Sequence, residues 1–227
     1  MKSRVVAIVP AAGSGRRLGL KTKKPFVRLG GKPLVWYALN ALNRSASVDA
    51  IVVAAERSSV GRFKRLAARY GFRKVAAVIE GGKERADSVR NCLAAIGPGF
   101  DIVLIHDGAR PLVDGRMIAD SVRLAVKYGG CVVAVPEIDT VKLAGRDLVV
   151  DRTLERSRIF RAQTPQAFRR ALLERAYRAM GVRRARGMTD DAGLVEKVGG
   201  RVKILEGSYR NIKVTTKEDL ELAEVLL

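Results

Sequence analysis

The sequence predicts an α/β fold whose mostly parallel, twisted sheet carries helices on both faces, with a β-hairpin arm protruding from it. Two observations predict the sheet. Short apolar, β-branched runs alternate with amphipathic stretches along the 227 residues. Small or polar residues follow most of these runs, at the point where a strand would end. Because parallel strands need helical crossovers, such a sheet is covered on both sides.

Seven apolar runs are expected as strands. They are Val5–Pro10, Ala50–Ala55, Val75–Ile79, Ile102–His106, Cys131–Pro136, Val202–Leu205 and Ile212–Thr215. Between them, helices are indicated where apolar residues recur at three- and four-residue spacing. The best examples are Val89, Cys92, Leu93 and Ile96, and then Ile118, Val122, Ala125 and Val126. A last helix is expected after a capping box that runs from Thr215 to Glu218.

The segment Val141–Phe160 does not fit this alternation, and it predicts the arm. Its apolar residues alternate around a turn, as in a β-hairpin: Val141, Leu143, Leu148 and Val150. Two strands alone are not stable in water, so the hairpin must lie against another surface, most simply a second copy of the chain. We therefore expect one domain over residues 1–227, with 139–160 as an extended dimerisation arm.

The chain is strongly basic, with 43 lysines and arginines against 23 acidic residues and a net charge of +20. Such a charge raises the question of a nucleic-acid partner. However, the charge is dispersed, and aromatic residues make up only 5% of the chain, too few to suggest stacking platforms. We expect a surface that attracts phosphorylated small molecules, and no nucleic-acid partner.

The sequence also predicts a cytoplasmic protein. The first residues lead into an apolar run that Pro10 ends early, unlike a signal peptide. No segment approaches the roughly 20 apolar residues that span a bilayer, so no membrane association is expected. Cys92 and Cys131 lie far apart in apolar contexts and match no metal-binding spacing. We expect both to be buried thiols in a reducing compartment.

The most informative stretch follows the first predicted strand. There, Ala11-Ala12-Gly13-Ser14-Gly15 leads into two arginines, with lysines shortly after. Small residues let backbone N–H groups approach an anion and the cations neutralise it, as in a nucleoside triphosphate site. The loop is not a dinucleotide fingerprint, because Leu18 stands where a third glycine belongs, and no Walker A motif is present. A tight turn with solvated arginines is the alternative.

A similar arrangement follows the strand Ile102–His106, which leads into Asp107-Gly108-Ala109-Arg110. An aspartate at the edge of a sheet can bind Mg²⁺ on a triphosphate, and an arginine three positions later can bind a second phosphate. Alternatively, Asp107 and Arg110 form a local pair that closes the turn. His106, the only histidine, is expected to be a packed core residue without a catalytic role.

Further polar clusters lie at the expected ends of elements. Gly81-Gly82 precedes a helix and would let a planar base lie against the backbone. Lys213 lies in the last predicted strand, either as a snorkelling edge residue or as a directed cation. The remaining clusters are weak signals on their own: Asp139-Thr140, Arg156, Thr164-Pro165-Gln166 and Thr189-Asp190-Asp191.

Together, these motifs resemble those of the 2-C-methyl-D-erythritol 4-phosphate cytidylyltransferases of the non-mevalonate isoprenoid pathway, over essentially the whole chain. The resemblance rests on five motifs in order: 11–17, 81–89, 102–111, 164–166 and 211–220. It implies a Rossmann-like nucleotidyltransferase fold and a homodimer in which each arm crosses to the neighbour. It also implies CTP and a sugar-alcohol phosphate as substrates, and Mg²⁺ or another divalent cation as cofactor.

The resemblance implies a role for each matching residue. The catalytic residues would be Arg17, Lys24, Arg156 and Lys213. Lys23 stays an alternative to Lys24, because proline follows the lysine pair here and precedes the lysine in the family. CTP would contact Ala11, Ala12, Gly13, Gly15, Gly82, Arg85 and Ser88. The acceptor would contact Asp107, Arg110, Thr140, Thr164 and Thr189, with Asp107 also a metal ligand.

The implied chemistry agrees with these residue types. A phosphate oxygen of the acceptor attacks the α-phosphorus of CTP, and pyrophosphate leaves. The attacking oxygen is already ionised, so the reaction needs cations that hold two anions together rather than a protein nucleophile or base. Two alternatives stay open: a ribitol 5-phosphate cytidylyltransferase, and a non-catalytic basic protein that binds nucleotides or RNA.

Overall fold

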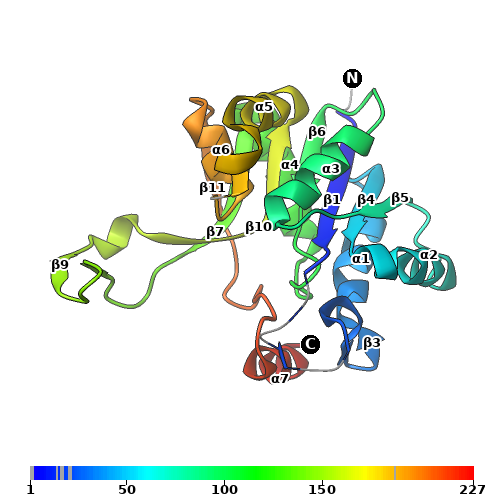
Figure 1. Ribbon diagram of the computed structural model, residues 1–227, viewed down its shortest axis with the longest axis horizontal. Coiled ribbons are helices and arrows are strands. Elements are labelled where there is room, and N and C mark those ends of the chain that lie inside the picture. Colours follow the sequence, from blue (N-terminus) through cyan, green and yellow to red (C-terminus); the bar gives the residue numbers. More distant parts are fainter. Residues whose placement is uncertain (1–2, 14, 16–17, 20–21, 187) are drawn as a thin grey trace.

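A seven-stranded sheet runs through the centre of the structure, a computed structural model that describes residues 3–13, 15, 18–19, 22–186 and 188–227 (Figure 1). In sheet order its strands are β11 (Val202–Glu206), β7 (Gly130–Pro136), β10 (Phe160–Arg169), β6 (Ile102–Ile105), β1 (Val5–Ala11), β4 (Ala50–Ala55) and β5 (Val75–Glu80). Neighbouring strands are parallel, except that β10 is antiparallel to both β6 and β7. The predicted mostly parallel sheet is confirmed.

Helices cover both faces of this sheet because successive strand residues point to opposite sides. In β1, Val5, Ala7 and Val9 belong to one apolar core and Val6 and Ile8 to the other. The first core is closed by α1 (Leu34–Arg44), α2 (Val60–Arg69) and α4 (Gly115–Tyr128). The second is closed by α3 (Arg85–Ala95), α5 (Arg170–Arg186) and α6 (Asp191–Lys197). Both expected buried thiols are confirmed, since Cys131 lies in the first core and Cys92 in the second.

All the predicted strands but one form, and one strand of the central sheet was not predicted. The segment Ile212–Thr215 is not a strand. It runs beyond the edge of the sheet, where Val214 N–H donates to the carbonyl of Ala109 at 2.9 Å. The unpredicted strand is β10, which begins at the residue where the arm was expected to end. Its antiparallel pairing makes the sheet mixed rather than fully parallel.

Two helix details differ from the sequence prediction. The last helix is α7 (Lys217–Leu226), and its capping box joins Thr216 to Asp219, one residue later than expected. The shift occurs because Asp219 accepts from both the Thr215 and the Thr216 backbone N–H groups. In α4, Val126 is exposed although Ile118 and Ala125 are buried. Val126 was predicted to share the buried face of this helix, but the helix turns it away from the sheet.

The predicted hairpin forms β8 (Lys142–Ala144) and β9 (Val150–Thr153), which pair with each other in a separate two-stranded sheet. Figure 1 shows it extending well away from the central sheet. Its apolar residues Leu143, Leu148 and Val150 are exposed, with Leu148 85% exposed. The hairpin therefore has no surface of its own subunit to cover these side chains.

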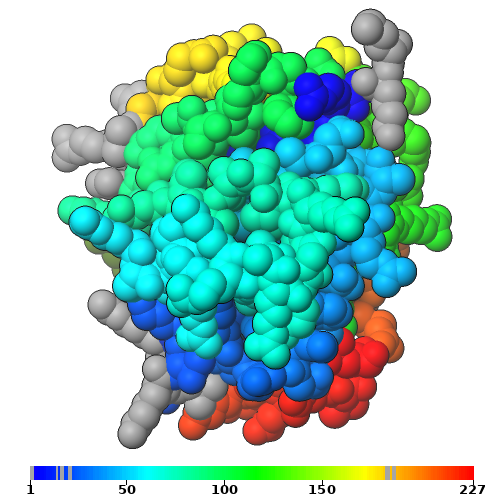
Figure 2. All heavy atoms as spheres, turned by 90° about the vertical axis from the view of Figure 1, so that its right-hand side faces the viewer, coloured from blue at the N-terminus to red at the C-terminus, as the bar shows by residue number. Residues whose placement is uncertain are grey.

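The side of the molecule opposite the arm is shown in Figure 2, where α2 and β5 cover the middle and α7 lies at the lower edge. There α7 packs beside a small hairpin of β2 (Arg28–Leu29) and β3 (Lys32–Pro33). Their contact encloses a third apolar cluster that includes Leu29, Leu34 and Ala223. None of the helices in the described ranges is long and apolar enough to cross a membrane.

Candidate active site

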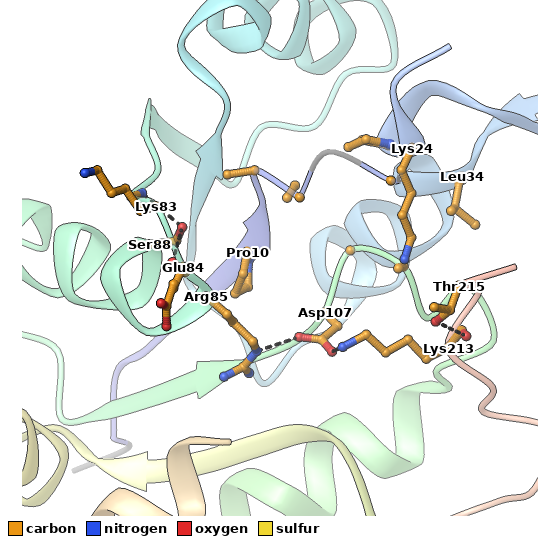
Figure 3. Close-up of a pocket in the computed structure, with 18 residues that line it drawn as sticks. Pro10, Lys24, Leu34, Lys83, Glu84, Arg85, Ser88, Asp107, Lys213 and Thr215 are labelled. Carbon is orange, nitrogen blue, oxygen red and sulfur yellow. Dashed lines mark hydrogen bonds and ion pairs between the residues drawn. The ribbon is translucent and has the colours of Figure 1, made fainter. Parts of the chain in front are cut away.

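A cavity of about 550 Å³ opens where β1 and its neighbours in the sheet end (Figure 3). Three segments form its walls: residues 11–13 and 15 at the end of β1, residues 82–85 after β5 and residues 107–109 after β6. The lining is completed by Pro10, Lys24, Pro25, Leu34, Ser88, Lys213 and Thr215. Ligands bind at the carboxyl ends of the strands in open α/β sheets, so this is the expected position for a site.

The loop after β1 contributes small residues to the cavity, namely Ala11, Ala12, Gly13 and Gly15. Gly15 has a positive φ of +68°, and a Cβ atom there would lie 2.6 Å from the Cβ of Lys24. Glycine is therefore required for this loop to pack against the segment that carries Lys24. The predicted catalytic residue Arg17 lies outside the described residues, as do Ser14 and Arg16.

The two candidate lysines have different surroundings. The Lys24 side chain lines the cavity, on the opposite side from Ser88 in Figure 3. Lys23 instead donates to Glu56 Oε1 at 2.8 Å and to Ser58 Oγ at 2.5 Å. Their register is fixed by the next residues, since Pro25 and Phe26 are buried and the Phe26 ring packs 4.9 Å from that of Phe63. The geometry favours Lys24 over Lys23.

A second wall of the cavity is mostly backbone. A Cβ atom on Gly82 would lie 2.1 Å from the Cβ of Asp87, and its N–H donates to Ser88 Oγ at 3.1 Å. Asp87 and Glu84 form the capping box that begins α3. The packing of α3 against the loop therefore admits only glycine at position 82, and it leaves a flat surface against which a base can lie.

Asp107 is the centre of a chain of charged groups. Its carboxylate accepts from Arg85 Nε at 3.1 Å and from Lys213 Nζ at 2.6 Å. Arg85 continues the chain to Asp191 Oδ2 at 2.6 Å, and Asp191 Oδ1 accepts from the Tyr177 hydroxyl. Burial alone would raise the pKa of Asp107, but Arg85 and Lys213 hold it well below its usual range. Asp107 is therefore ionised and held between two cations.

The alternative of a local Asp107–Arg110 side-chain pair is not what the structure shows. The turn is closed by the backbone, since Arg110 N–H donates to the Asp107 carbonyl at 3.0 Å. The Arg110 guanidinium instead donates to the backbone carbonyl of Asn211 at 2.6 Å. Arg110 is thereby directed away from the larger cavity.

A second cavity of about 160 Å³ shares one wall with the first. Arg85, Asp107 and Lys213 line both cavities, and the smaller one also contains Arg110, Thr164 and Thr189. An irregularity in the pairing of β10 with β7, between Ala162 and Gln166, places Thr164 there. Four of the five predicted acceptor-binding residues, all but Thr140, are thus brought together.

Two predicted site residues, Thr140 of the acceptor-binding set and Arg156 of the catalytic set, do not line these cavities within one chain. Thr140 lies at the start of the arm and Arg156 at its other end, in a short 3₁₀ helix (Arg156–Arg158). Both are exposed, and Arg156 donates to the carbonyl of Ile138 at 2.8 Å. The structure therefore places them on the arm rather than beside Lys24 and Asp107.

Some supporting residues were not predicted from the sequence. Gln166 donates to Asp190, and its Oε1 accepts from the backbone N–H groups of Asp191 and Ala192. Asn211 donates to the carbonyl of Thr164 at 2.9 Å, which ties β10 to the segment carrying Lys213. The Thr164-Pro165-Gln166 and Thr189-Asp190-Asp191 clusters were signals for this network, but the sequence does not show that they meet.

The donor set does not form a self-sufficient metal site. Among the described residues, no group of three or more histidine, cysteine, aspartate or glutamate side chains could hold a metal ion. Both carboxylate oxygens of Asp107 are already paired with cations, and Glu84 caps α3. A divalent cation here would be held mainly by phosphate oxygens of a nucleotide, as is common for Mg²⁺.

His106 is fully buried, as predicted, and its burial lowers the pKa to about 4. The folded protein thus keeps this residue neutral at a pH where the unfolded chain protonates it near its ordinary value of 6.5. Stability from this group is present above pH 6.5 and is lost as the pH falls towards 4. Between pH 7 and pH 5 we expect a loss of about 2 kcal/mol in the free energy of unfolding.

Urea unfolding of the wild type and of His106→Gln at pH 7 and pH 5 measures this loss. Since His106 is the only histidine, the variant should lose most of the pH dependence in this range, whatever its stability at pH 7. If the free energy of unfolding changed equally with pH in both proteins, His106 would not be the neutral buried group described here.

With this geometry established, comparisons with known proteins identify similar chains. Residues 5–227 match the family model described as 2-C-methyl-D-erythritol 4-phosphate cytidylyltransferase. A protein of that name from Pelotomaculum thermopropionicum is 46% identical over 225 residues, covering 99% of this chain and 94% of the relative. One from Geobacillus kaustophilus is 47% identical over 221 residues, covering 97% of this chain and 96% of the relative.

Solved structures agree. The crystal structure of a 4-diphosphocytidyl-2C-methyl-D-erythritol synthase from Anaerococcus prevotii superposes with a TM-score of 0.86 at 28% identity, covering 99% of this chain and 98% of the other. That of a 2-C-methyl-D-erythritol 4-phosphate cytidylyltransferase from Thermus thermophilus has a TM-score of 0.78 at 30% identity, covering 100% and 98%.

Proposed function

The chain belongs to the 2-C-methyl-D-erythritol 4-phosphate cytidylyltransferase family, and we propose that its two connected cavities hold the two substrates. The enzyme joins CTP to 2-C-methyl-D-erythritol 4-phosphate in the non-mevalonate isoprenoid pathway. The observation that supports this placement is the wall of Arg85, Asp107 and Lys213, which lines both cavities. The reacting phosphates of CTP and the acceptor must come together. The shared wall lies between the two cavities and places the cations Arg85 and Lys213 on either side of the Asp107 carboxylate.

CTP occupies the larger cavity in this proposal. Its volume of about 550 Å³ suits a nucleotide. The base lies against Gly82 and Ser88, where the wall is backbone, and the triphosphate follows the loop of small residues from Ala11 to Gly15. Lys24 enters from the other side and, together with Arg17, would neutralise the charge that builds on the α-phosphate.

The acceptor phosphate occupies the smaller cavity. Arg110 and Lys213 supply positive charge there, Thr189 supplies a hydroxyl group, and Thr164 lines the wall while it contacts His106 and Asp107. One acceptor phosphate oxygen forms a bond to the α-phosphorus of CTP while the bond to the pyrophosphate oxygen breaks. No proton must be removed from the attacking oxygen. The protein's contribution is therefore positioning and electrostatic stabilisation.

Activity in this proposal also needs a divalent cation, which the triphosphate carries into the site and which would neutralise phosphate charge. Excess chelator should then abolish turnover, and added Mg²⁺ should restore it. Because Asp107 is already paired with Arg85 and Lys213, Asp107→Asn should leave the Mg²⁺ concentration for half-maximal rate nearly unchanged while lowering the rate itself. Full activity in chelator would contradict the cation requirement, and a large shift in Mg²⁺ demand would make Asp107 a metal ligand.

We further propose that the enzyme is a cytoplasmic homodimer in which each arm completes the acceptor site of its partner. Two observations support the dimer: the arm exposes Leu143, Leu148 and Val150, and Arg156 lies away from the cavities of its own subunit. A partner surface would bury the former and bring the latter to an acceptor phosphate. The two buried free thiols fit a reducing compartment.

A substrate panel tests the proposed placement. Pyrophosphate release should require CTP and 2-C-methyl-D-erythritol 4-phosphate together. ATP should be poorer by about 100-fold or more, since a purine does not fit a wall of backbone packed on Ala12 and Asp87. Ribitol 5-phosphate serves as the matched acceptor control and should react far more slowly. Equal turnover with ATP, or release without an acceptor, would contradict the assignment.

A further inference from the structure

One buried imidazole contacts the Arg110 end of the 107–110 turn directly and the Asp107 end through Thr164. His106 Nε2 lies 3.1 Å from the carbonyl oxygen of Arg110, and Nδ1 lies 3.0 Å from Thr164 Oγ1. Thr164 Oγ1 in turn accepts from the Asp107 backbone N–H at 3.1 Å. All three of these contacts are buried.

The directions of these hydrogen bonds follow from the groups involved. A carbonyl oxygen only accepts, so Nε2 must carry the proton and donate to Arg110. In the neutral ring Nδ1 then accepts, and the Thr164 hydroxyl donates to it. The hydroxyl oxygen remains free to accept from Asp107 N–H. The network has a single consistent arrangement, and the burial of His106 favours the neutral ring that it needs.

This network binds the turn to β10. Asp107 is attached through Thr164, and Arg110 is attached through the ring itself. Asp107 and Arg110 both line the smaller cavity, whereas Gly108 and Ala109 between them line only the larger one, which Asp107 also borders. A shift of the turn relative to β10 would therefore move both Arg110 and Asp107, the cation and the carboxylate that line the acceptor cavity.

We propose that His106 is a positioning residue for the acceptor, which sets the separation of Asp107 and Arg110 through its two ring nitrogens without touching either substrate. The inference rests on the proposed binding of the acceptor phosphate in the smaller cavity. It assigns His106 an effect on acceptor binding that exceeds its effect on CTP binding. The walls at Gly82 and Ser88, where the base would lie, are held by α3, and only the 107–109 wall of the larger cavity depends on this ring.

Two substitutions separate the two ring bonds. His106→Asn places an amide oxygen near the position of Nδ1, so it keeps the acceptor for Thr164 and is too short to reach Arg110. His106→Gln places an amide nitrogen near the position of Nε2, so it keeps the donor to Arg110 and loses the acceptor for Thr164. His106→Phe keeps the ring volume and removes both bonds.

The measurement is steady-state kinetics with each substrate varied, together with the CTP dissociation constant by calorimetry and the folded fraction by circular dichroism. We expect His106→Asn and His106→Gln each to raise the KM for the acceptor by about tenfold, the size of one lost hydrogen bond. His106→Phe should raise it further, and the affinity for CTP should stay near that of the wild type. Thr164→Ser, which keeps the hydroxyl, should rescue most of the loss seen in Thr164→Val.

A purely structural role would give a different result. Activity would fall in proportion to the folded fraction, and the KM values for both substrates would stay the same or rise together. Either outcome overturns the proposal. If His106→Phe does not fold, the Thr164→Val and His106→Gln single and double variants decide the matter. Their losses in kcat/KM for the acceptor should fall short of multiplying, because both variants remove the hydrogen bond between Thr164 and the ring.

Arg110→Lys distinguishes failure of this inference from failure of the proposed function. If Arg110→Lys raises the acceptor KM and the His106 variants do not, only the positioning role is wrong. If Arg110→Lys also leaves the acceptor KM unchanged, the acceptor does not bind in the smaller cavity, and both proposals fall.

Discussion

Replacing Lys24 by methionine should lower kcat by about 10²–10³-fold and change the KM for CTP much less. Lys24 lines the larger cavity beside the loop that would hold the triphosphate. A cation placed where charge develops acts more strongly on the transition state than on bound CTP, so its loss affects the rate. Pre-steady-state measurement of pyrophosphate release separates the chemical step from product release.

Lys23→Met is the matched control. Lys23 lies next to Lys24 in the chain, but its ammonium group pairs with Glu56 and Ser58 at a partly exposed site. Exposed ion pairs contribute little to stability, so this variant should keep most of its activity. A larger loss in Lys23→Met than in Lys24→Met would contradict the assignment. Arg17→Ala should show a loss of rate similar to that of Lys24→Met.

Mixing two inactive variants should restore activity if the arm completes the partner's site. Arg156→Ala alone should lose about 10² in rate, because it removes a cation from the acceptor phosphate. After subunit exchange with Lys24→Ala, each mixed dimer has one site with Lys24 from one chain and Arg156 from the other. Random exchange makes half of the dimers mixed, so about a quarter of wild-type activity should return.

A second pair of variants controls for non-specific recovery. Lys24 and Lys213 line the cavity of the same chain, so mixing Lys24→Ala with Lys213→Ala leaves every site with one substitution. No activity should return in that mixture. Sedimentation and labelled subunits establish that exchange took place. Recovery in the control pair, or none in the Arg156 pair despite complete exchange, would mean that the arm does not cross between subunits.

The sequence predicted most of the sheet because apolar periodicity is a local signal. It did not reveal β10, because that strand carries buried polar residues where a strand usually carries apolar ones. Gln163, Thr164 and Gln166 interrupt the apolar pattern, and Pro165 cannot donate to a neighbouring strand. Gln163, Thr164 and Gln166 line the smaller cavity. The polar residues that the site needs therefore remove the apolar pattern by which a strand is recognised in the sequence.

The candidate loops were predictable for a similar reason, since small residues and cations are recognisable within a few positions. The partners of those residues were not, because they meet only in the folded chain. Arg85 reaches Asp107, 22 residues away, and Asp191, 106 residues away. The different surroundings of Lys23 and Lys24 depend on Glu56, which no pattern near the lysines indicates.

A crystal structure of Lys24→Met with CTP and 2-C-methyl-D-erythritol 4-phosphate tests the central claim most directly, because this slow variant should retain both substrates. We expect the cytosine against Gly82 and Ser88, and the acceptor phosphate beside Arg110 and Lys213, with Arg85 and Asp107 between the two ligands. An acceptor phosphate bound away from the smaller cavity, or a nucleotide bound outside the larger one, would contradict the account.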